Sequence, residues 1–471
     1  MSKKQMGKKH KNKKKLIGLL VFYNLVLLGC LVTLLLLFGP DSSIRTASDS
    51  VTRSDSASLS GQTDPAGAAG LTDFAGENGQ LAGDPDKPGT ADSLQDPDEE
   101  AFAPYSITLM AVGDNLMHMG AVNAGKQPDG TYDYSFLYEN LTESLARADI
   151  SIINQETILG GNERGFSGYP YFNSPTQVGD AIAAAGFNVV LQASNHTADQ
   201  GLDGLKSCLD FWKNTHPEVL LCGIHEVSDT SIPVLTIGEL TFAVLNYTYG
   251  PNMETLPADL DQYLNLLCDW DSTTRRLDFT TLNPKVTEDI KKASELADVV
   301  IVCPHWGTEY TFVPSSYQKT FAMQMTEAGA DLIIGTHPHV VQPVEWIEAS
   351  NGNRALCYYS LGNYISTQKN PESMLEAMAW VTFQVTEDAV SIDPDKTGVL
   401  PLVCQYTTGP LRVQGTYFLE DYTEELALSH GIRGYGGVTL HLEQLQEWSN
   451  EIFGDWILPK SILEQDPLTA P

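Results

Sequence analysis

The sequence predicts an α/β domain over residues 101–471, preceded by a membrane anchor and a flexible linker. From about residue 107 onward, short apolar runs alternate with amphipathic stretches, which is the order of strands and helices in α/β domains. Several of the apolar runs end in Asp, Asn, Glu or His, as expected where a sheet edge binds a ligand. The first hundred residues lack this alternation and differ sharply in composition.

The N-terminus predicts a membrane anchor. Residues 1–15 contain eight lysines, and an uncharged apolar run follows from Leu16 to Phe38. About 20 apolar residues suffice to cross a bilayer, and the lysines keep their own side in the cytoplasm. A cleaved signal peptide is the alternative, but its apolar region is usually only about 7–15 residues long and ends at small residues. We therefore expect a single-pass protein of the cell membrane whose main domain lies outside the cytoplasm.

Residues 39–100 are expected to form a flexible linker. They are rich in Ser, Thr, Asp, Gly, Ala and Pro, and they contain few large apolar side chains. Such a segment cannot bury enough apolar surface to offset the entropy lost on ordering. The remaining residues, 101–471, are numerous enough to bury a large core.

Charge and cysteine content restrict the class of partner. The formal net charge of −32 repels nucleic acid, so we expect no nucleic-acid partner. The seven cysteines include no CxxC pair and lie mostly within apolar stretches. Buried free thiols are therefore expected rather than a disulfide framework.

In the first half of the domain, apolar runs of a few residues are assigned as strands. Stretches whose apolar side chains recur every three or four residues are assigned as helices. Pro175 marks the start of one helix and Gly186 its end. The expected strands are 107–112, 150–153, 189–193 and 219–222, and the expected helices are 136–146, 178–185 and 201–212.

A hairpin of 234–237 and 241–247 opens the second half. Residues 250–283 are polar and irregular in pattern, and we expect them to form a lid or rim over the site. Beyond them amphipathic stretches again alternate with apolar runs, and the later segments are rich in β-forming residues. The expected helices are 287–296, 317–328 and 440–452, and the expected strands are 299–303, 332–334, 344–347, 356–359, 379–385 and 399–405.

Polar residues at the ends of the apolar runs form a candidate metal site. Carboxylate, amide and imidazole groups without thiolates suit Zn, Mn, Fe or Co. Two such ions can clamp a phosphoryl group and activate water. We therefore expect one or two divalent metal ions, such as Mn, Zn or Fe. The expected ligands are Asp114, Glu156, Asn195, His305, His337 and His339.

The histidines of this set have different expected roles. His337 and His339 are two residues apart, so along an extended stretch they would face the same way. His196 is left free to donate a proton to a leaving group, and Asp199 would orient it. Taken singly, a histidine after a strand is more often a hydrogen-bonding loop residue, but five such strand ends together favour a site. His118, His216 and His225 are expected to have no function.

The polar segments resemble, in the same order, those of the poly-γ-glutamate capsule synthesis proteins (CapA-like), which belong to the calcineurin-like metallophosphoesterase superfamily. The similar segments are 111–114, 154–156, 193–201, 305–307, 335–339 and 359–363. The resemblance covers nearly the whole predicted domain. It implies a four-layer α/β/β/α sandwich with the metals at one sheet edge.

The resemblance also assigns roles residue by residue. Asp114 is similar to the superfamily's first metal ligand, Glu156 to its bridging carboxylate, and Asn195-His196 to its Asn-His motif. His305 is similar to its lone fourth-motif histidine, and His337 and His339 to its final histidine pair.

Three positions depart from the pattern. Leu116 stands where the superfamily has a histidine ligand, and Glu156 where it usually has Asp. Gln155 stands where the family commonly has Leu. The first two departures are shared with the capsule family, and they leave open whether one or two metals bind.

The leading hypothesis is a membrane-anchored, extracytoplasmic metal-dependent hydrolase or transferase. By resemblance, it would act in the synthesis or export of poly-γ-glutamate or a related acidic cell-surface polymer, in contact with the polymer's synthase complex. The alternative is a non-catalytic export factor that binds the polymer or the synthase. A nucleotidase or general phosphodiesterase is a minor alternative, for which Trp270, Trp306 and Tyr310 would line a cleft, although Trp306 is more simply explained by packing.

Overall fold

The computed structural model describes residues 102–253 and 255–465. The predicted basic tail, membrane anchor and linker therefore lie outside the described residues. Those that are described belong to one compact unit, Leu94–Pro471. Within this described part, no helix is both long and apolar enough to cross a membrane.

The larger sheet has nine strands, in the order β17-β16-β14-β1-β2-β3-β4, with β13 paired to β1 and β15 paired to β14. Strands β1 to β4 are parallel, so their C-terminal ends meet at one edge, whereas β14, β16 and β17 are antiparallel to their neighbours. The bounds are β1 (Tyr105–Asn115), β2 (Ile150–Asn154), β3 (Val189–Leu191), β4 (Leu220–Cys222), β13 (Asn363–Ile365), β14 (Leu375–Val385), β15 (Val390–Ile392), β16 (Gly398–Thr408) and β17 (Leu411–Phe418).

The smaller sheet has six strands, in the order β11-β12-β10-β9-β6-β5. Its four inner strands, β12, β10, β9 and β6, are parallel, and antiparallel strands flank them. The bounds are β5 (Val234–Ile237), β6 (Leu240–Thr248), β9 (Val299–His305), β10 (Leu332–Ile334), β11 (Val341–Glu348) and β12 (Arg354–Leu361).

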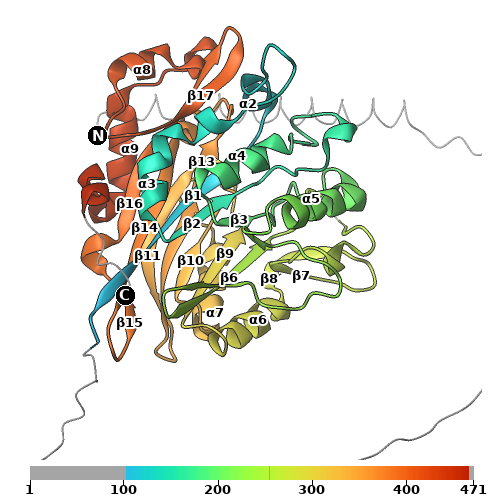
Figure 1. Ribbon diagram of the computed structural model, residues 1–471, viewed down its shortest axis with the longest axis vertical. Coiled ribbons are helices and arrows are strands. Elements are labelled where there is room, and N and C mark those ends of the chain that lie inside the picture. Colours follow the sequence, from blue (N-terminus) through green and yellow to red (C-terminus); the bar gives the residue numbers. More distant parts are fainter. Residues whose placement is uncertain (1–101, 254, 466–471) are drawn as a thin grey trace, which may run out of the picture. The chain divides into compact units, whose positions relative to one another are not determined.

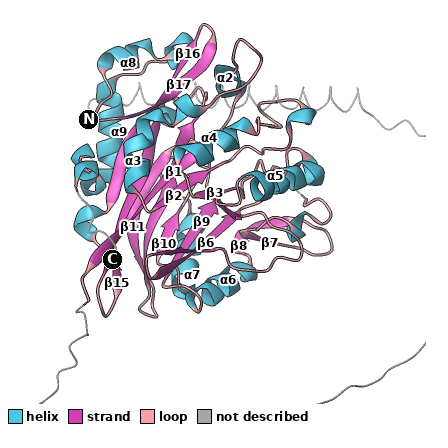
Figure 2. Cartoon of the chain, viewed as in Figure 1, coloured by secondary structure: helices cyan, strands magenta, loops and turns pink. Residues whose placement is uncertain are grey.

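Helices cover the outer faces of the two sheets, which gives the four α/β/β/α layers that the resemblance implies (Figures 1 and 2). Helices α3, α4 and α5 pack on the nine-stranded sheet, and α6 and α7 pack on the six-stranded sheet. The helix bounds are α2 (Met119–Ala124), α3 (Thr142–Arg147), α4 (Gln177–Ala185), α5 (Gly201–Thr215), α6 (Pro284–Ser294), α7 (Ser316–Ala328), α8 (Glu424–Ser429) and α9 (Leu442–Phe453).

Successive side chains along the strands of the smaller sheet point to opposite faces and belong to two different hydrophobic cores. Phe242 of β6 points into the core between the sheets, where its ring centroid lies 5.4 Å from that of Phe383 on β14. The next residue, Ala243, belongs to the core beneath α6 and α7. Because the inner strands are buried on both faces, they read in sequence as continuous apolar runs. The six cysteines of the described residues are buried and free, as expected.

Two of the expected elements are wrong in detail. The helix expected over 136–146 is two 3₁₀ turns, Ser135–Leu137 and Glu139–Leu141, followed by α3. The interruption lies at Tyr138, whose phenol is buried and accepts a hydrogen bond from Asn115 Nδ2 at 3.2 Å. Residues 250–283, expected to be irregular, contain the paired strands β7 (Cys268–Trp270) and β8 (Leu277–Leu282).

Short or weakly patterned elements were not expected at all. They are α2, α8, β13, β15 and β17. Helices α2 and α8 have only six residues each, so they show less than two full turns of periodicity. Strand β17 pairs with β16 across a bulge, which interrupts the two-residue alternation of its side chains.

Candidate metal centre

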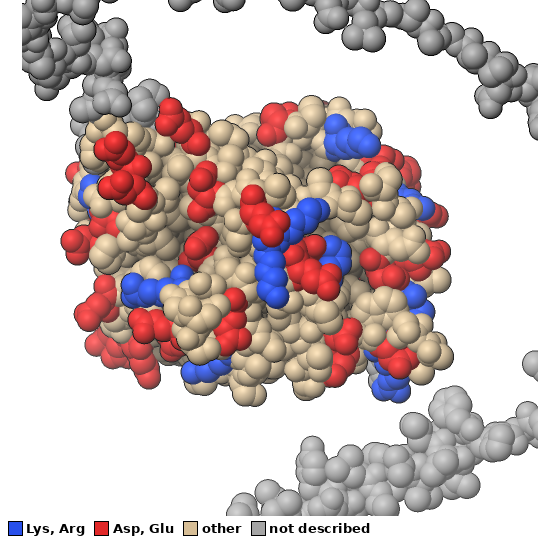
Figure 3. Space-filling model, turned by 90° about the horizontal axis from the view of Figure 1, so that it is seen from below, with Lys and Arg blue, Asp and Glu red and all other residues tan. Residues whose placement is uncertain are grey.

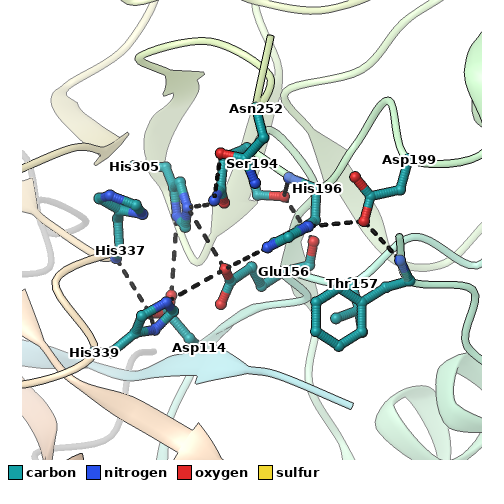
Figure 4. Close-up of polar contacts among 12 residues, drawn as sticks. Asp114, Glu156, Thr157, Ser194, His196, Asp199, Asn252, His305, His337 and His339 are labelled. Atoms are coloured by element: carbon teal, nitrogen blue, oxygen red, sulfur yellow. Dashed lines mark hydrogen bonds and ion pairs between the residues drawn. The ribbon is translucent and has the colours of Figure 1, made fainter. Parts of the chain in front are cut away.

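The polar residues at the strand ends meet at one edge shared by the two sheets (Figure 4). Parallel strands bring them together, because β1, β2, β3, β9 and β10 all end there. Each of the six expected ligands, and His196 with them, is no more than 4% exposed. The residues and their positions are Asp114 in β1, Glu156 after β2, Asn195 and His196 after β3, His305 at the end of β9, and His337 and His339 after β10.

Glu156 lies at the centre of this group. Its Oε1 atom is 3.9 Å from the Nε2 atom of each of three histidines, His196, His305 and His339. Both of its carboxylate oxygens are buried and have no hydrogen-bond partner. An unpaired buried carboxylate is costly unless a proton or a cation compensates it. The three imidazoles cannot all be protonated at such close range, so the arrangement favours a bound cation.

Asp114 is held beside Glu156 by its strand and its neighbours. Asn154 Nδ2 donates to its Oδ1 atom at 2.7 Å, and the His337 backbone N–H donates to its Oδ2 atom at 3.2 Å. His339 Nδ1 is also 3.2 Å from Oδ2. The preceding Gly113 lets the backbone of Gly362 lie against β1, because a Cβ there would lie 2.0 Å from the Gly362 carbonyl oxygen, and the Asp114 N–H donates to that oxygen at 3.0 Å.

His337 and His339 do not lie on an extended stretch, so that part of the expectation is wrong. Their φ angles are 98° and 57°, in the left-handed region that non-glycine residues rarely adopt. Strained backbone of this kind persists only where surrounding contacts hold it, and it is common at functional sites. The two rings lie 5.7 Å apart and are tilted by 54°.

His196 is oriented by Asp199. Its Nδ1 atom is 2.7 Å from Asp199 Oδ2, which also accepts the Phe172 backbone N–H at 2.7 Å. The short contact places the ring proton on Nδ1, which leaves Nε2 facing Glu156. Phe172 packs edge-on against the imidazole, with ring centroids 4.6 Å apart.

His305 connects the two sheets at the site. Its Nε2 atom is 2.9 Å from Asn195 Oδ1, and its Nδ1 atom is 3.0 Å from Thr336 Oγ1. The same ring lies 3.9 Å from Asp114 and 3.9 Å from Glu156. His305 therefore contacts Asn195, which follows β3 of the larger sheet, and Thr336, which follows β10 of the smaller sheet.

Burial and mutual proximity shift the ionisation of the group. Burial raises the pKa of Glu156 well above its usual range, and the neighbouring Asp114 charge raises it further. Burial lowers the pKa values of His305 and His337. Burial alone would also lower the pKa of His339, but the carboxylates of Glu156 and Asp114 raise it to about 9. These shifts favour a proton on Glu156 or His339 when no cation neutralises the carboxylates.

The residues present fit a divalent metal. One set of candidate ligand atoms comprises Asp114, Glu156 and His339, and a second comprises Glu309, His337 and His339. Within each set the atoms lie within 4.8 Å of one another. Carboxylate and imidazole donors of this kind bind Zn, Mn and Fe. Asn195 and His305 lie beside the first set, since they contact each other and His305 Nε2 is 3.9 Å from Glu156 Oε1.

The sequence reasoning missed two residues of this region. Glu309 follows His305 by four residues in the same polar segment, and that proximity was the available signal. Asn363 ends the similar segment 359–363, but the resemblance assigns it no role. Its Oδ1 atom is 3.0 Å from His339 Nδ1, so it helps to orient that ring.

The other residues named from the sequence belong to neither candidate ligand set. His118 is half-buried at the start of α2, beside Phe172, and burial lowers its pKa to about 3. Trp306 is fully buried and donates its indole N–H to the Tyr359 carbonyl, which supports packing. Tyr310 is 46% exposed, and its ring centroid lies 5.9 Å from that of His339.

Comparisons with known proteins agree with these motifs. The family described as "Bacterial capsule synthesis protein PGA_cap" matches residues 108–368. The "PGA biosynthesis protein CapA" of Bacillus subtilis (strain 168) is 31% identical over 39% of this chain and 43% of its own length. The "Capsule biosynthesis protein CapA" of Bacillus anthracis is 26% identical over 57% of this chain and 63% of its own. The chain thus spans about half the length of these curated relatives.

One solved structure is similar at a low level. The calcineurin-like phosphoesterase YfkN from Bacillus subtilis aligns with 77% of this chain and 99% of the matched chain, at 10% identity and a TM-score of 0.36. That similarity is too weak to assign a fold, which rests here on the observed layers of the chain itself.

Proposed function

We propose a function that starts from the family: this chain belongs to the bacterial capsule synthesis protein family. In our proposal the protein is a metal-dependent hydrolase or transferase that acts in the synthesis or export of a polymer. Its substrate would be poly-γ-glutamate or a related acidic polymer of the cell surface. The names of two relatives, which refer to PGA and capsule biosynthesis, support this choice of polymer.

One observation carries the proposal. Glu156 is fully buried, both of its oxygens lack a hydrogen-bond partner, and three imidazole nitrogens face one of them at 3.9 Å. Such a group does not stabilise a fold by packing, because no hydrogen bond or ion offsets the free-energy cost of removing its carboxylate from water. Divalent cations held by Asp114, Glu156 and the histidines would repay it.

In this proposal some side chains bind metal and another donates a proton. A bound divalent ion would polarise an oxygen of the substrate and lower the pKa of water. Asp114, Glu156, Asn195, His305, His337 and His339 would hold one or two such ions. His196 stands beside this group with Nε2 turned inward, and Asp199 fixes its tautomer. In our proposal His196 acts in its doubly protonated form, with Asp199 paired to Nδ1–H, and donates its Nε2 proton to the leaving group, a contribution worth about 10²–10⁴ in rate.

The same proposal includes the location of the protein. The lysine-rich tail and the apolar run from Leu16 to Phe38 favour a membrane anchor, and residues 39–100 a linker that lets the domain reach a polymer leaving its synthase. On the face shown in Figure 3, Asp and Glu side chains are spread widely, with smaller groups of Lys and Arg among them. Such a surface repels a polyanion, so bound cations would be needed where the polymer approaches.

The test is metal content together with turnover. The full-length chain, purified in detergent, should retain Mn, Zn or Fe through gel filtration and should hydrolyse a chromogenic phosphodiester. Activity on γ-glutamyl polymer, followed by chain length, distinguishes amide chemistry from phosphoester chemistry. A chain that binds none of the three metals and turns over neither substrate would overturn the proposal.

The non-catalytic export factor remains the second candidate, and one observation favours it. Leu116, buried at 2% exposure, replaces an expected ligand, so the site has fewer donors than a two-metal hydrolase of the superfamily. A His337→Ala/His339→Ala double variant separates the two functions. Loss of polymer in producing cells supports the enzyme, whereas unchanged polymer output from a folded double variant supports the export factor.

A further inference from the structure

The strand-end pattern leaves one acidic residue beside the centre without a role. Glu309 lies four residues beyond His305, in the loop that follows β9, and its side chain is exposed. A carboxylate oxygen of Glu309 and ring nitrogens of His337 and His339 all lie within 4.8 Å of one another. No metal ligand was expected at this position.

The backbone holds Glu309 in this place. The Trp306 N–H donates to the Thr336 carbonyl at 3.0 Å, and the Tyr310 N–H donates to the Pro338 carbonyl at 2.8 Å. These two bonds fasten the loop after β9 to the loop that bears both histidines. Tyr310, directly after Glu309, has a φ of 60°, so three residues around the cluster adopt left-handed backbone. Contacts must hold such conformations, each of which costs about 1–3 kcal/mol.

His337 provides the second observation. Its Nδ1 atom is buried and has no hydrogen-bond partner among the described residues. The imidazole belongs to the Glu309 set but not to the set of Asp114 and Glu156. A buried nitrogen without a partner costs free energy, which coordination to a metal would recover.

The number of available ligand atoms connects Glu309 with His337. A neutral imidazole offers one nitrogen lone pair to a metal, so His339, which the two sets share, can serve only one of them. If it serves Asp114 and Glu156, Glu309 and His337 remain as a carboxylate and an imidazole for another ion. Two histidines with a glutamate and an open position for water are a ligand combination found in catalytic sites.

We propose that Glu309 is a metal ligand, and that with His337 it completes a second metal position in a chain where Leu116 has removed the usual histidine donor. This inference rests on the proposed metal-dependent function. Because Glu309 is exposed, its position is the one open to solvent and hence to an acidic polymer. The ion at Glu309 would therefore be the one that meets the substrate.

The test counts bound metal instead of relying on activity. Full-length wild type, Glu309→Gln and the control Glu327→Gln are titrated with Mn²⁺ and assayed for ions per chain and for the affinity of the weaker ion. Glu327 is an exposed glutamate on α7, outside both ligand sets. We expect two ions in wild type and in the control. Glu309→Gln should lose one ion or bind it at least about tenfold more weakly, the lower bound for disturbing a metal's surroundings.

A rescue variant guards against an indirect effect. Glu309→His restores a donor of different chemistry, so it should recover the second ion and shift its preference from Mn²⁺ toward Zn²⁺. Two equally tight ions in Glu309→Gln, or a single ion in both wild type and Glu309→Gln, would overturn the inference while leaving the proposed function in place. A wild-type chain that binds no metal would instead overturn the proposed function itself.

Discussion

Two glutamates of this protein have buried carboxyl groups without hydrogen-bond partners, but their surroundings differ. Glu156 follows β2 at the site edge, and Glu376 lies within β14. Both side chains are fully buried, both lack hydrogen-bond partners for their two oxygens, and burial raises the pKa of each well above its usual range. Three imidazoles face Glu156 at 3.9 Å, whereas no ion pair is found for Glu376 among residues 102–253 and 255–465.

The difference shows what a strand end adds to a buried carboxylate. Within β14, burial and the nearby Asp114 charge both disfavour the charged form of Glu376, and no ion pair among the described residues offsets them. At the end of β2, loops from both sheets bring nitrogen and oxygen donors around Glu156, so a cation can replace the protons. We therefore interpret Glu376 as a structural acid and Glu156 as the centre of a metal site.

The largest expected contrast concerns turnover. His196→Gln should lower the turnover of the metal-loaded chain by about 10²–10⁴-fold, because the proton donor beside Glu156 is lost. Its metal content should not change. Glu376→Gln, measured in parallel by steady-state kinetics, should lower turnover far less, because Glu376 belongs to neither candidate ligand set, although the Asp114 charge reaches it. Equal losses in the two variants would remove the distinction between the regions.

Metal affinity gives the next contrast. Glu156→Gln should weaken Mn²⁺ binding by more than about 10–100-fold, the range seen when only the surroundings of a ligand are disturbed. Glu376→Gln keeps the shape of its side chain and should leave that affinity unchanged. Isothermal titration of both variants checks this, with circular dichroism to verify folding. A Glu156→Gln chain that binds Mn²⁺ like wild type would contradict the assignment.

The dependence of metal binding on pH sharpens the comparison. A cation must displace the proton of His339, whose pKa is raised to about 9, and any proton on Glu156. Affinity should therefore rise with pH from about 6 to 9, by up to roughly tenfold per pH unit for each proton displaced. Titrations in buffers of different ionisation enthalpy measure the protons released. Binding that is independent of pH would show that neither group holds a proton.

The smallest effect is on stability. The pKa of Glu376 is raised in the folded state, so its protonated form stabilises the fold below the unfolded value of about 4.3, and this contribution is lost as pH rises. Glu376→Gln has no proton to lose. Its thermal midpoint relative to wild type should therefore increase from pH 4 to pH 7. A relative decrease would mean that Glu376 is charged and stabilised in the fold.

Much of this arrangement could be predicted from sequence, because the physics is local. Buried parallel strands are apolar along their whole length, so a polar residue such as Asp114 or His305 marks the strand end. Since parallel strands share an edge, such residues could be expected to meet. Asp199 beside His196 followed from the short spacing between them.

The remaining features depend on contacts between distant segments. The left-handed backbone at His337 and His339 is not implied by an extended pattern, because tertiary hydrogen bonds hold it. Glu309 is brought to the histidines by tertiary bonds of its loop, from Trp306 to Thr336 and from Tyr310 to Pro338. Glu376 was not predicted as a buried acid, because nothing in its neighbouring sequence distinguishes it from a surface glutamate.

The most direct test of the central claim is the position of bound metal. Crystals of the protein grown with excess Mn²⁺ should give an anomalous peak within about 2.0–2.6 Å of a Glu156 carboxylate oxygen, the usual range for oxygen ligands of such cations. No peak should appear at Glu376. An empty centre, with Glu156 hydrogen-bonded as a neutral acid in fully loaded crystals, would contradict the account.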